Sequence, residues 1–266
     1  MNDLEKQIKI LENEKRVLNR QVNELSKKNL FKQSFGGRRI RVGVISDTHK
    51  GSLYANQQLE DSLIGYFNKK NVDVIYHCGD ICDGEKMYRG HEYEIKHHGA
   101  DNQVKHCVDT FPKIDSKMFF ITGNHDLSFY KNAGVDIGTL ISRDRDDMEY
   151  LGQEQALIEI APNVRIMLMH PGGGTAYAVS YKSQKLVESF TGGEKPNILL
   201  TGHFHKYDHL FYRNIQAFQV PTTCSQTPFM KRKPTPAIMG GLLLDIHVNK
   251  NGINKLITEY LPYYEK

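Results

Sequence analysis

Side chains that are apolar, with Lys15 as the exception, recur every seven residues over the first 30 positions, a pattern that the rest of the chain lacks. A second apolar series follows the first by three places. The first series is Met1, Ile8, Lys15 and Val22, and the second is Leu4, Leu11, Leu18 and Leu25. This is the a/d seam of a coiled coil, and β-branched residues at a with Leu at d favour two parallel strands. We therefore predict a homodimer through residues 1–30; the alternative is one amphipathic helix folded onto the rest of the chain.

The helical pattern breaks at Gly36 and Gly37, and the remainder alternates strand-like and helix-like stretches. Strands are predicted over 40–45, 72–77, 117–121, 156–160, 164–170, 197–201, 211–218, 239–248 and 253–260, and helices over 56–70, 86–110 and 176–190. The early strand-helix-strand order implies parallel pairing, and residues 249–252 form a hairpin turn between the last two strands. We expect a mixed α/β sandwich over residues 35–266, preceded by a coiled-coil helix over residues 1–34.

Composition narrows the class of protein. The chain has 266 residues, of which 39% are hydrophobic and 25% charged, enough for a substantial core. A mean hydropathy of −0.52 and the absence of a long apolar run argue against a membrane protein. The first residues lack the pattern of a secretory signal, and the four cysteines form no C-x-x-C pair, so a cytoplasmic location is expected. A net charge of +4 is too small to indicate nucleic-acid binding.

Polar residues of the types that bind metals collect where five of the predicted strands end. The segments are Asp47-Thr48-His49, Gly79-Asp80, Gly123-Asn124-His125-Asp126, His170 and Gly202-His203-Phe204-His205. Each segment alone is weak evidence, because such residues are common in turns. Ligands of open α/β sheets gather beyond the carboxyl ends of the strands, however. The five segments together therefore predict one shared site.

This ordered set of motifs resembles that of the calcineurin-like metallophosphoesterases, dinuclear-metal enzymes that hydrolyse phosphate esters. The resemblance covers about residues 39–250. It implies a four-layer α-β-β-α sandwich, with two mixed sheets flanked by helices and two metal ions at one end of the sheets. Residues 35–266 would then form the catalytic domain, and the predicted coiled coil lies outside it.

The resemblance also implies a division of the metal ligands. The first metal would be held by Asp47, His49 and His205, the second by Asn124, His170 and His203, with Asp80 bridging both. One carboxylate has two oxygens and can bind two cations about 3.5–4 Å apart. Imidazole, carboxylate and amide donors without a thiolate suit Mn²⁺, Fe or Zn²⁺. Manganese is the expectation from the resemblance.

Three residues next to the ligands have implied roles in catalysis. In related enzymes the residue that matches His125 protonates the leaving oxygen or stabilises the transition state. Asp126 would orient that imidazole, although a helix N-cap explains it equally well. Asp83 resembles the second acid of the family's G-D-x-x-D pattern and would support a ligand from behind.

Candidate substrate contacts follow His170. The backbone of Gly173 and Gly174 could cradle a phosphate, and Tyr177 and Lys182 are near enough in sequence to reach the substrate. A flexible turn and a solvated helix face are the alternatives. The predicted helix over residues 86–110 carries a group of histidines that we assign to a solvated face rather than to a third metal site; they are His91, His97, His98 and His106.

The reaction expected is attack on a phosphate ester by a hydroxide bridging the two metals. Two motifs resemble those of the double-strand-break repair nucleases and related diesterases. One is G-N-H-D with Asp126 in fourth place, and the other is the stretch from Asp47 to Gly51. Gly84 follows Asp83, where the family's protein phosphatases carry Arg-Gly. We therefore predict a phosphodiesterase acting on nucleic acid or nucleotides, although the roughly 60 residues after the last motif show no DNA-capping domain. A phosphomonoesterase acting on proteins or small molecules, a catalytically silent coiled-coil scaffold and a nucleic-acid-binding module are the alternatives.

Overall fold

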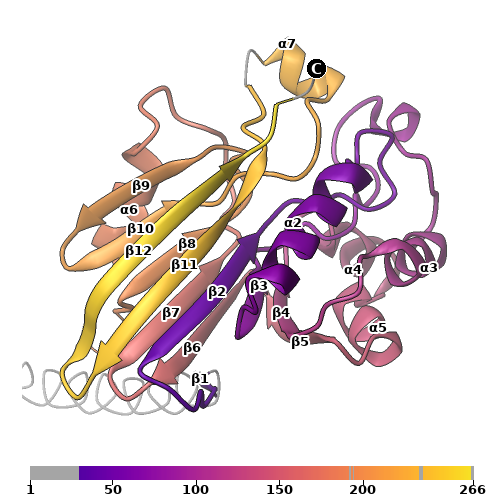
Figure 1. Ribbon diagram of the computed structural model, residues 1–266. Helices are drawn as coiled ribbons and strands as arrows, with labels where there is room; N and C mark the ends of the chain where they lie inside the picture. Colours follow the sequence, from indigo (N-terminus) through magenta and orange to yellow (C-terminus); the bar gives the residue numbers. More distant parts are fainter. Residues whose placement is uncertain (1–29, 192, 194, 234–235, 265–266) are drawn as a thin grey trace, which may run out of the picture.

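The computed structural model describes residues 30–191, 193, 195–233 and 236–264. Two six-stranded sheets lie face to face, with helices on both outer faces (Figure 1). This four-layer α-β-β-α arrangement confirms the predicted fold class. The coiled coil predicted over residues 1–30 lies, apart from Leu30, outside the described residues. Among the helices that the structure describes, none combines the length and the apolar character needed to cross a bilayer.

The first sheet combines four parallel strands with an antiparallel hairpin. Its strands are, in spatial order, β12 (Gly252–Pro262), β11 (Gly240–Asn249), β2 (Arg39–Ile45), β3 (Val74–His77), β4 (Lys117–Thr122) and β5 (Met148–Gln153). The pairs from β2 to β5 are parallel, whereas β11 runs antiparallel to β2 and to β12. The hairpin predicted at residues 249–252 is therefore confirmed.

The second sheet is also mixed. Its strands are, in spatial order, β1 (Leu30–Lys32), β6 (Gln155–Ala161), β7 (Val164–Met169), β8 (Ile198–Thr201), β10 (Ile215–Gln219) and β9 (Asp208–Tyr212). The edge strand β1 pairs parallel with β6. Leu30–Lys32, within the range that we predicted as a coiled-coil helix, are therefore an edge strand of this sheet.

Buried aliphatic side chains fill the space between the sheets. Val42 and Val44 of β2 alternate toward Ile158 and Ile166 of the opposite sheet, and all four are fully buried. This period of two is the pattern expected of strands that bury one face. A second apolar cluster lies under α2 (Gln57–Lys69), α3 (Ala100–Thr110), α4 (Leu127–Ala133) and α5 (Ile137–Asp144), and a third lies under α6 (Tyr181–Ser189). The remaining helices are η1 (His91–Tyr93) and α7 (Pro228–Arg232).

Two of the predicted elements are wrong. The helix expected over residues 86–110 is limited to α3, because Gly90 and Gly99 take left-handed φ angles of 92° and 89° and interrupt any longer helix. The single strand expected over residues 211–218 is the β9–β10 hairpin. Its turn is made by Arg213 and Asn214, with φ angles of 50° and 59°, as a two-residue type I′ turn requires.

Candidate metal centre

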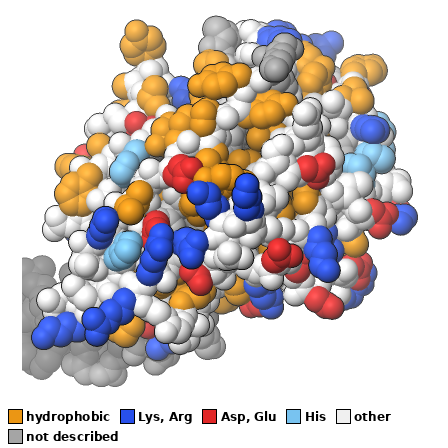
Figure 2. Space-filling view, in the orientation of Figure 1, with side chains coloured by type: hydrophobic (Ala, Val, Ile, Leu, Met, Phe, Trp, Pro, Cys, Tyr) orange, Lys and Arg blue, Asp and Glu red, His pale blue; other side chains and the backbone are white. Residues whose placement is uncertain are grey.

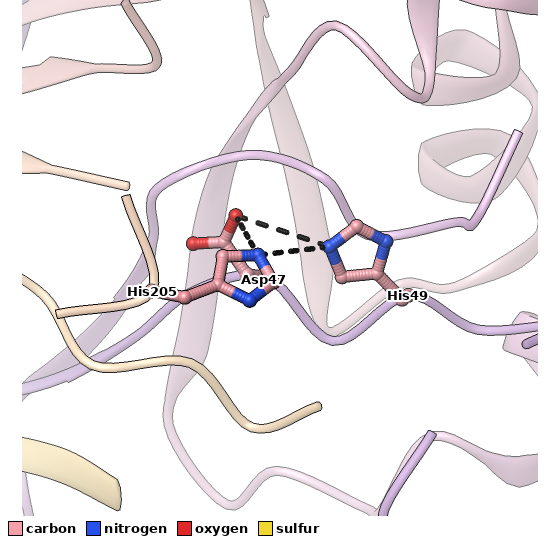
Figure 3. A group of neighbouring side chains, drawn as sticks. All are labelled: Asp47, His49 and His205. Atoms are coloured by element: carbon pink, nitrogen blue, oxygen red, sulfur yellow. Dashed lines mark hydrogen bonds and ion pairs between the residues drawn. The ribbon is translucent and has the colours of Figure 1, made fainter. Parts of the chain in front are cut away.

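Three side chains from distant parts of the chain form the first donor cluster. Asp47 and His49 follow β2, and His205 follows β8 (Figure 3). His205 Nε2 lies 3.3 Å from Asp47 Oδ1 and 3.3 Å from His49 Nε2. One donor atom of each residue lies within 4.8 Å of the others, so a single cation could contact all three. The sequence assigned this same trio to the first metal.

The second cluster lies at the ends of β3, β4 and β7. His170 Nε2 is 3.0 Å from Asp80 Oδ2 and 3.1 Å from Asn124 Oδ1. His203 completes a group of three with Asp80 and His170. Asp80 Oδ2 is also 4.0 Å from His49 Nε2 of the first cluster. Asp80 therefore lies between the two clusters, where a bridging carboxylate is needed.

The outer nitrogens of three imidazoles are fixed by hydrogen bonds directed away from the clusters. His49 Nδ1 donates to Asp83 Oδ1 at 3.0 Å, His170 Nδ1 to the carbonyl of Cys78 at 2.8 Å, and His203 Nε2 to the carbonyl of Gly173 at 2.6 Å. Such bonds set the tautomer and leave the other nitrogen available as a ligand. The donor set and its supports therefore fit a pair of divalent cations.

The backbone at the ligands takes an unusual conformation. Five of the seven predicted ligands have φ angles in the left-handed region, between 45° and 78°; they are Asp47, His49, Asp80, His203 and His205. Non-glycine residues rarely adopt this region, and where they do so the strain is concentrated at functional sites. Gly79, with φ of 94°, is required for a further reason: a Cβ there would lie 2.5 Å from His170 Nδ1.

The buried carboxylates and imidazoles of the site shift one another's pKa. Burial opposes the charged form of His170, but Asp80 and Asp47 outweigh it and raise the pKa of His170 to about 10. Burial likewise opposes the charged form of His49, while Asp83 and Asp80 raise the pKa of His49 to about 9. Burial alone would raise the pKa of Asp80, yet His170 and His125 hold it well below its usual range. The buried carboxylates therefore stabilise positive charge at this site, which divalent cations would supply.

His125 lies beside the donor clusters, in the wall of a cavity, and one of its ring nitrogens lies within 4.8 Å of a donor atom of His49 and one of Asp80. Its Nδ1 donates to the carbonyl of Asp83 at 2.5 Å, and its backbone N–H donates to Asp80 Oδ1 at 2.9 Å. Burial lowers the pKa of His125 to about 4, although Asp80 opposes this shift. The imidazole therefore lies beside Asp80, and its role as a proton donor rather than a metal ligand stays a prediction.

Asp126 has a different environment from the one we expected. Its carboxylate accepts hydrogen bonds from the backbone N–H groups of Gly123, Ile81 and Cys82, at 2.8, 3.1 and 2.8 Å. These bonds tie the loop after β3 to the loop after β4. The imidazole of His125 is held by the Asp83 carbonyl instead, and the side chain of Asp126 makes no capping hydrogen bond to α4. Burial, with the charge of Asp80, raises the pKa of Asp126 to about 7.

His91 corrects one sequence interpretation. We expected a solvated position, but the residue is 1% exposed and its Nε2 donates to Asp83 Oδ2 at 3.2 Å. Asp83 thus accepts from both His49 and His91, and the His91 ring lies edge-on to His125 with centroids 5.5 Å apart. The interruption of the predicted helix by Gly90 is what turns His91 inward. Gly90 was the one signal in the sequence that could have indicated the buried position of His91.

The predicted substrate contacts divide into two groups. Gly173 and Gly174 line the cavity beside the donor clusters, whereas Tyr177 is fully exposed and Lys182 lies near Gly173 without lining the cavity. The cavity has a volume of about 500 Å³. Sequence analysis missed four further lining residues, since they belong to no motif; they are Met87, Tyr88, Phe229 and Met230. Lys233, from a basic run that the sequence assigns to the surface, also lines the cavity.

A comparison with family models matches residues 40–220 to the calcineurin-like phosphoesterase superfamily domain. This chain belongs to that superfamily. The matched range contains all seven predicted ligands and confirms the resemblance found in the sequence. Among curated proteins, none matches this calcineurin-like chain.

Solved structures with a similar fold include a phosphodiesterase, a phosphoesterase and Vps29. An archaeal phosphodiesterase is 14% identical over 84% of this chain and 100% of its own, with a TM-score of 0.49. The phosphoesterase Yfce of E. coli is 14% identical over 82% of this chain and 98% of its own, with a TM-score of 0.44. Vps29 of Entamoeba histolytica, solved with Zn²⁺, is 15% identical over 84% and 99%, with a TM-score of 0.42.

Proposed function

We propose that this calcineurin-like protein is a metal-dependent phosphodiesterase that hydrolyses phosphodiester bonds of nucleic acid or nucleotides. The observation that carries the proposal is the position of Asp80 between two donor clusters, His170 at 3.0 Å on one side and His49 at 4.0 Å on the other. Superfamily membership supports the reaction class. Two divalent cations, with Mn²⁺ proposed ahead of Fe or Zn²⁺, would lower the pKa of a water molecule between them and neutralise the phosphoryl oxygens.

The protein's own groups would do the remaining work. Asp47, Asp80 and His170 are almost fully buried and form a fixed floor, whereas Asn124, His203 and His205 are partly exposed and face the cavity. His125 would carry the proton for the leaving oxygen. The negative charge of a bound phosphate would favour its protonated form, offsetting the effect of burial on its pKa.

The charge of the cavity supports a diester over a monoester. A phosphate diester carries one negative charge near neutral pH, whereas a monoester carries nearly two and needs further cationic contacts. Among the described residues that line the cavity, Lys233 is the one Lys or Arg. Gly84 contributes no side chain beside His125, where a Cβ would collide with the His125 carbonyl. The backbone there has no room for the arginine of the phosphatase pattern.

Hydrolysis of bis(p-nitrophenyl) phosphate and of p-nitrophenyl phosphate in Mn²⁺ tests the proposal. We expect turnover of the diester in preference to the monoester, loss of activity on chelation, and recovery on addition of Mn²⁺. Asp80→Asn should abolish turnover, while Asp115→Asn, an exposed carboxylate on the α3–β4 connection, serves as the matched control. Turnover of the monoester alone would favour a phosphomonoesterase. Inactivity toward both esters with Mn²⁺, Fe²⁺ and Zn²⁺ would favour a silent scaffold.

The heptads of residues 1–30 support a second element of the proposal, a homodimer formed through a parallel coiled coil. The edge strand β1 begins at Leu30, directly after these heptads. Dimerisation would therefore place two catalytic domains at one end of the same coil.

A further inference from the structure

Part of the lining of the cavity at the candidate metal centre consists of residues to which we have assigned no role in metal binding or catalysis. The donor clusters and His125 form part of its lining; another part is formed by Met87, Tyr88, Phe229 and Met230, which we call the aromatic wall. Figure 2 shows hydrophobic side chains gathered near the end of the molecule where Figure 1 places α7. A phosphoryl group held by metal ions would make no use of such a wall.

Two segments that are distant in the sequence build the aromatic wall. Tyr88 belongs to the connection between β3 and α3, and Phe229 belongs to α7. Their rings stack with centroids 4.3 Å apart and an interplanar angle of 18°. Tyr88 is fixed further by a 2.7 Å hydrogen bond from its hydroxyl to Glu94 Oε2.

Local sequence features fix Phe229 as well. Thr227 caps α7, since its side chain accepts from the backbone N–H of Met230, and Pro228 occupies the first turn. The wall is thus ordered before a ligand arrives, which reduces the entropy lost on binding.

We propose that the aromatic wall binds the base of a nucleoside whose phosphodiester lies at the donor clusters. The inference rests on the proposed phosphodiesterase function and specifies its substrate as a nucleotide-sized ester. A flat, rigid base gains a large apolar contact area at little conformational cost, and the thioethers of Met87 and Met230 make favourable contacts with aromatic rings. The ammonium of Lys233 lies 6.0 Å from the centre of the Phe229 ring and adds positive charge beside the base and its phosphate.

The size of the cavity agrees with this class of substrate. About 500 Å³ lies within the range of sites for small organic ligands and exceeds the needs of a phosphoryl group alone. The proposed metal ligands and the wall line the same cavity, so base and phosphoryl group would be held within one space. This arrangement suits a single nucleotide or the last nucleotide of a strand.

Two esters with one leaving group separate the wall from the chemistry. Thymidine 5′-(p-nitrophenyl phosphate) and methyl p-nitrophenyl phosphate both release p-nitrophenolate, and they differ in whether a nucleoside is present. In the wild-type protein with Mn²⁺ we expect a lower KM for the thymidine ester. Phe229→Leu removes the ring but keeps an apolar side chain; it should raise the KM for the thymidine ester about 10- to 100-fold. Turnover of the methyl ester should stay unchanged, which also reports that the variant is folded.

Tyr93→Leu is the matched control, since Tyr93 is an aromatic residue of η1 that is 81% exposed and does not line the cavity. Equal kcat/KM for the two esters in the wild type, or an equal effect of Phe229→Leu on both, would overturn the inference while leaving the phosphodiesterase function in place. If neither ester is hydrolysed, the proposed function fails. Equilibrium binding of thymidine 5′-phosphate then tests whether the aromatic wall binds a base. Weaker binding by Phe229→Leu than by wild type and Tyr93→Leu would support it, and equal binding would contradict it.

Discussion

The carboxylate of Asp83 accepts a 3.0 Å hydrogen bond from Nδ1 of His49, and this bond directs Nε2 of the imidazole toward Asp47 and His205. Both residues are almost fully buried, so water cannot replace the carboxylate. Since the same carboxylate also receives Nε2 of His91, one acid orients two imidazoles beside the metal centre. The orientation of His49 in the candidate metal centre therefore depends on Asp83, which is not among the proposed ligands.

Asp83→Asn should weaken metal binding and lower turnover about 10- to 100-fold, because an amide is a weaker acceptor and its N–H₂ group cannot serve both histidines. Mn²⁺ affinity measured by competition with a chelating dye, together with kcat on a diester, checks this expectation. Asp115→Asn, at an exposed position, is the control. Unchanged metal affinity in Asp83→Asn would show that the hydrogen bond to His49 does not hold the ligand in place.

His125→Ala should lower kcat about 10²- to 10⁴-fold and leave the metal content unchanged. The imidazole lines the cavity and its Nδ1 donates to the Asp83 carbonyl, so Nε2 is the nitrogen left to serve the leaving oxygen. Metal analysis of the purified variant and steady-state kinetics measure the two quantities. His209→Ala, an exposed histidine of β9, is the control. Loss of metal from His125→Ala would make this residue a ligand and contradict its assignment as the proton donor.

The donor clusters could be predicted from the sequence because each ligand lies directly after a short apolar run. Parallel strands end at the same edge of a sheet, so the segments after β2, β3 and β4 had to meet. Asp83 was also accessible to prediction, since it lies three residues after Asp80 in the same loop. In these cases the local order of the chain determined the position in space.

The positions that could not be predicted depend on long-range contacts. The partners of Asp126 are backbone N–H groups, which every residue except proline has and which therefore produce no sequence motif. The aromatic wall joins Tyr88 to Phe229, which are 141 positions apart and belong to no motif. His91 was misassigned because helical periodicity was extended through Gly90, where the backbone turns the other way.

Glu60→Ala should destabilise the fold by about 3–5 kcal/mol, because it leaves the ammonium of Lys50 buried without its carboxylate. Lys50 Nζ lies 2.5 Å from Glu60 Oε2, and the two side chains are 1% and 0% exposed. The pair links α2 to the residue that follows His49. Urea unfolding monitored by circular dichroism gives the free energy. In contrast, Asp109→Ala breaks an exposed pair with Lys105 and should cost less than about 1 kcal/mol; equal costs for the two variants would contradict the argument.

The stability of the protein should fall between pH 6.5 and pH 4 in part through His106. Burial lowers the pKa of His106 to about 4, assisted by His97, Lys50 and Lys96 and opposed by Asp109. An unfolded histidine titrates near 6.5, so below that pH the unfolded chain binds a proton that the folded chain does not. The contribution of this group is therefore complete above pH 6.5 and is lost as the pH falls toward 4.

His106→Gln removes the titrating group, so the variant should lose less stability than the wild type between pH 7 and pH 5. Urea unfolding at both pH values gives the difference for each protein. His209→Gln, which changes an exposed histidine on the opposite sheet, should retain the dependence of the wild type. An identical pH dependence in wild type and His106→Gln would show that this imidazole is as easily protonated in the folded chain as in the unfolded one.

Removal of residues 1–29 should convert a dimer into a monomer without loss of diesterase activity. The cut leaves β1 intact, and β1 pairs with β6, so the sheet keeps its edge strand. Light scattering on the full chain and on the shortened chain measures the mass, and bis(p-nitrophenyl) phosphate reports turnover. As a control in the full chain, Leu11→Asp combined with Leu18→Asp places charges at two d positions of the predicted seam and should also give a monomer. A shortened chain that remains dimeric would place the interface on the described domain and leave the heptads without a role in assembly.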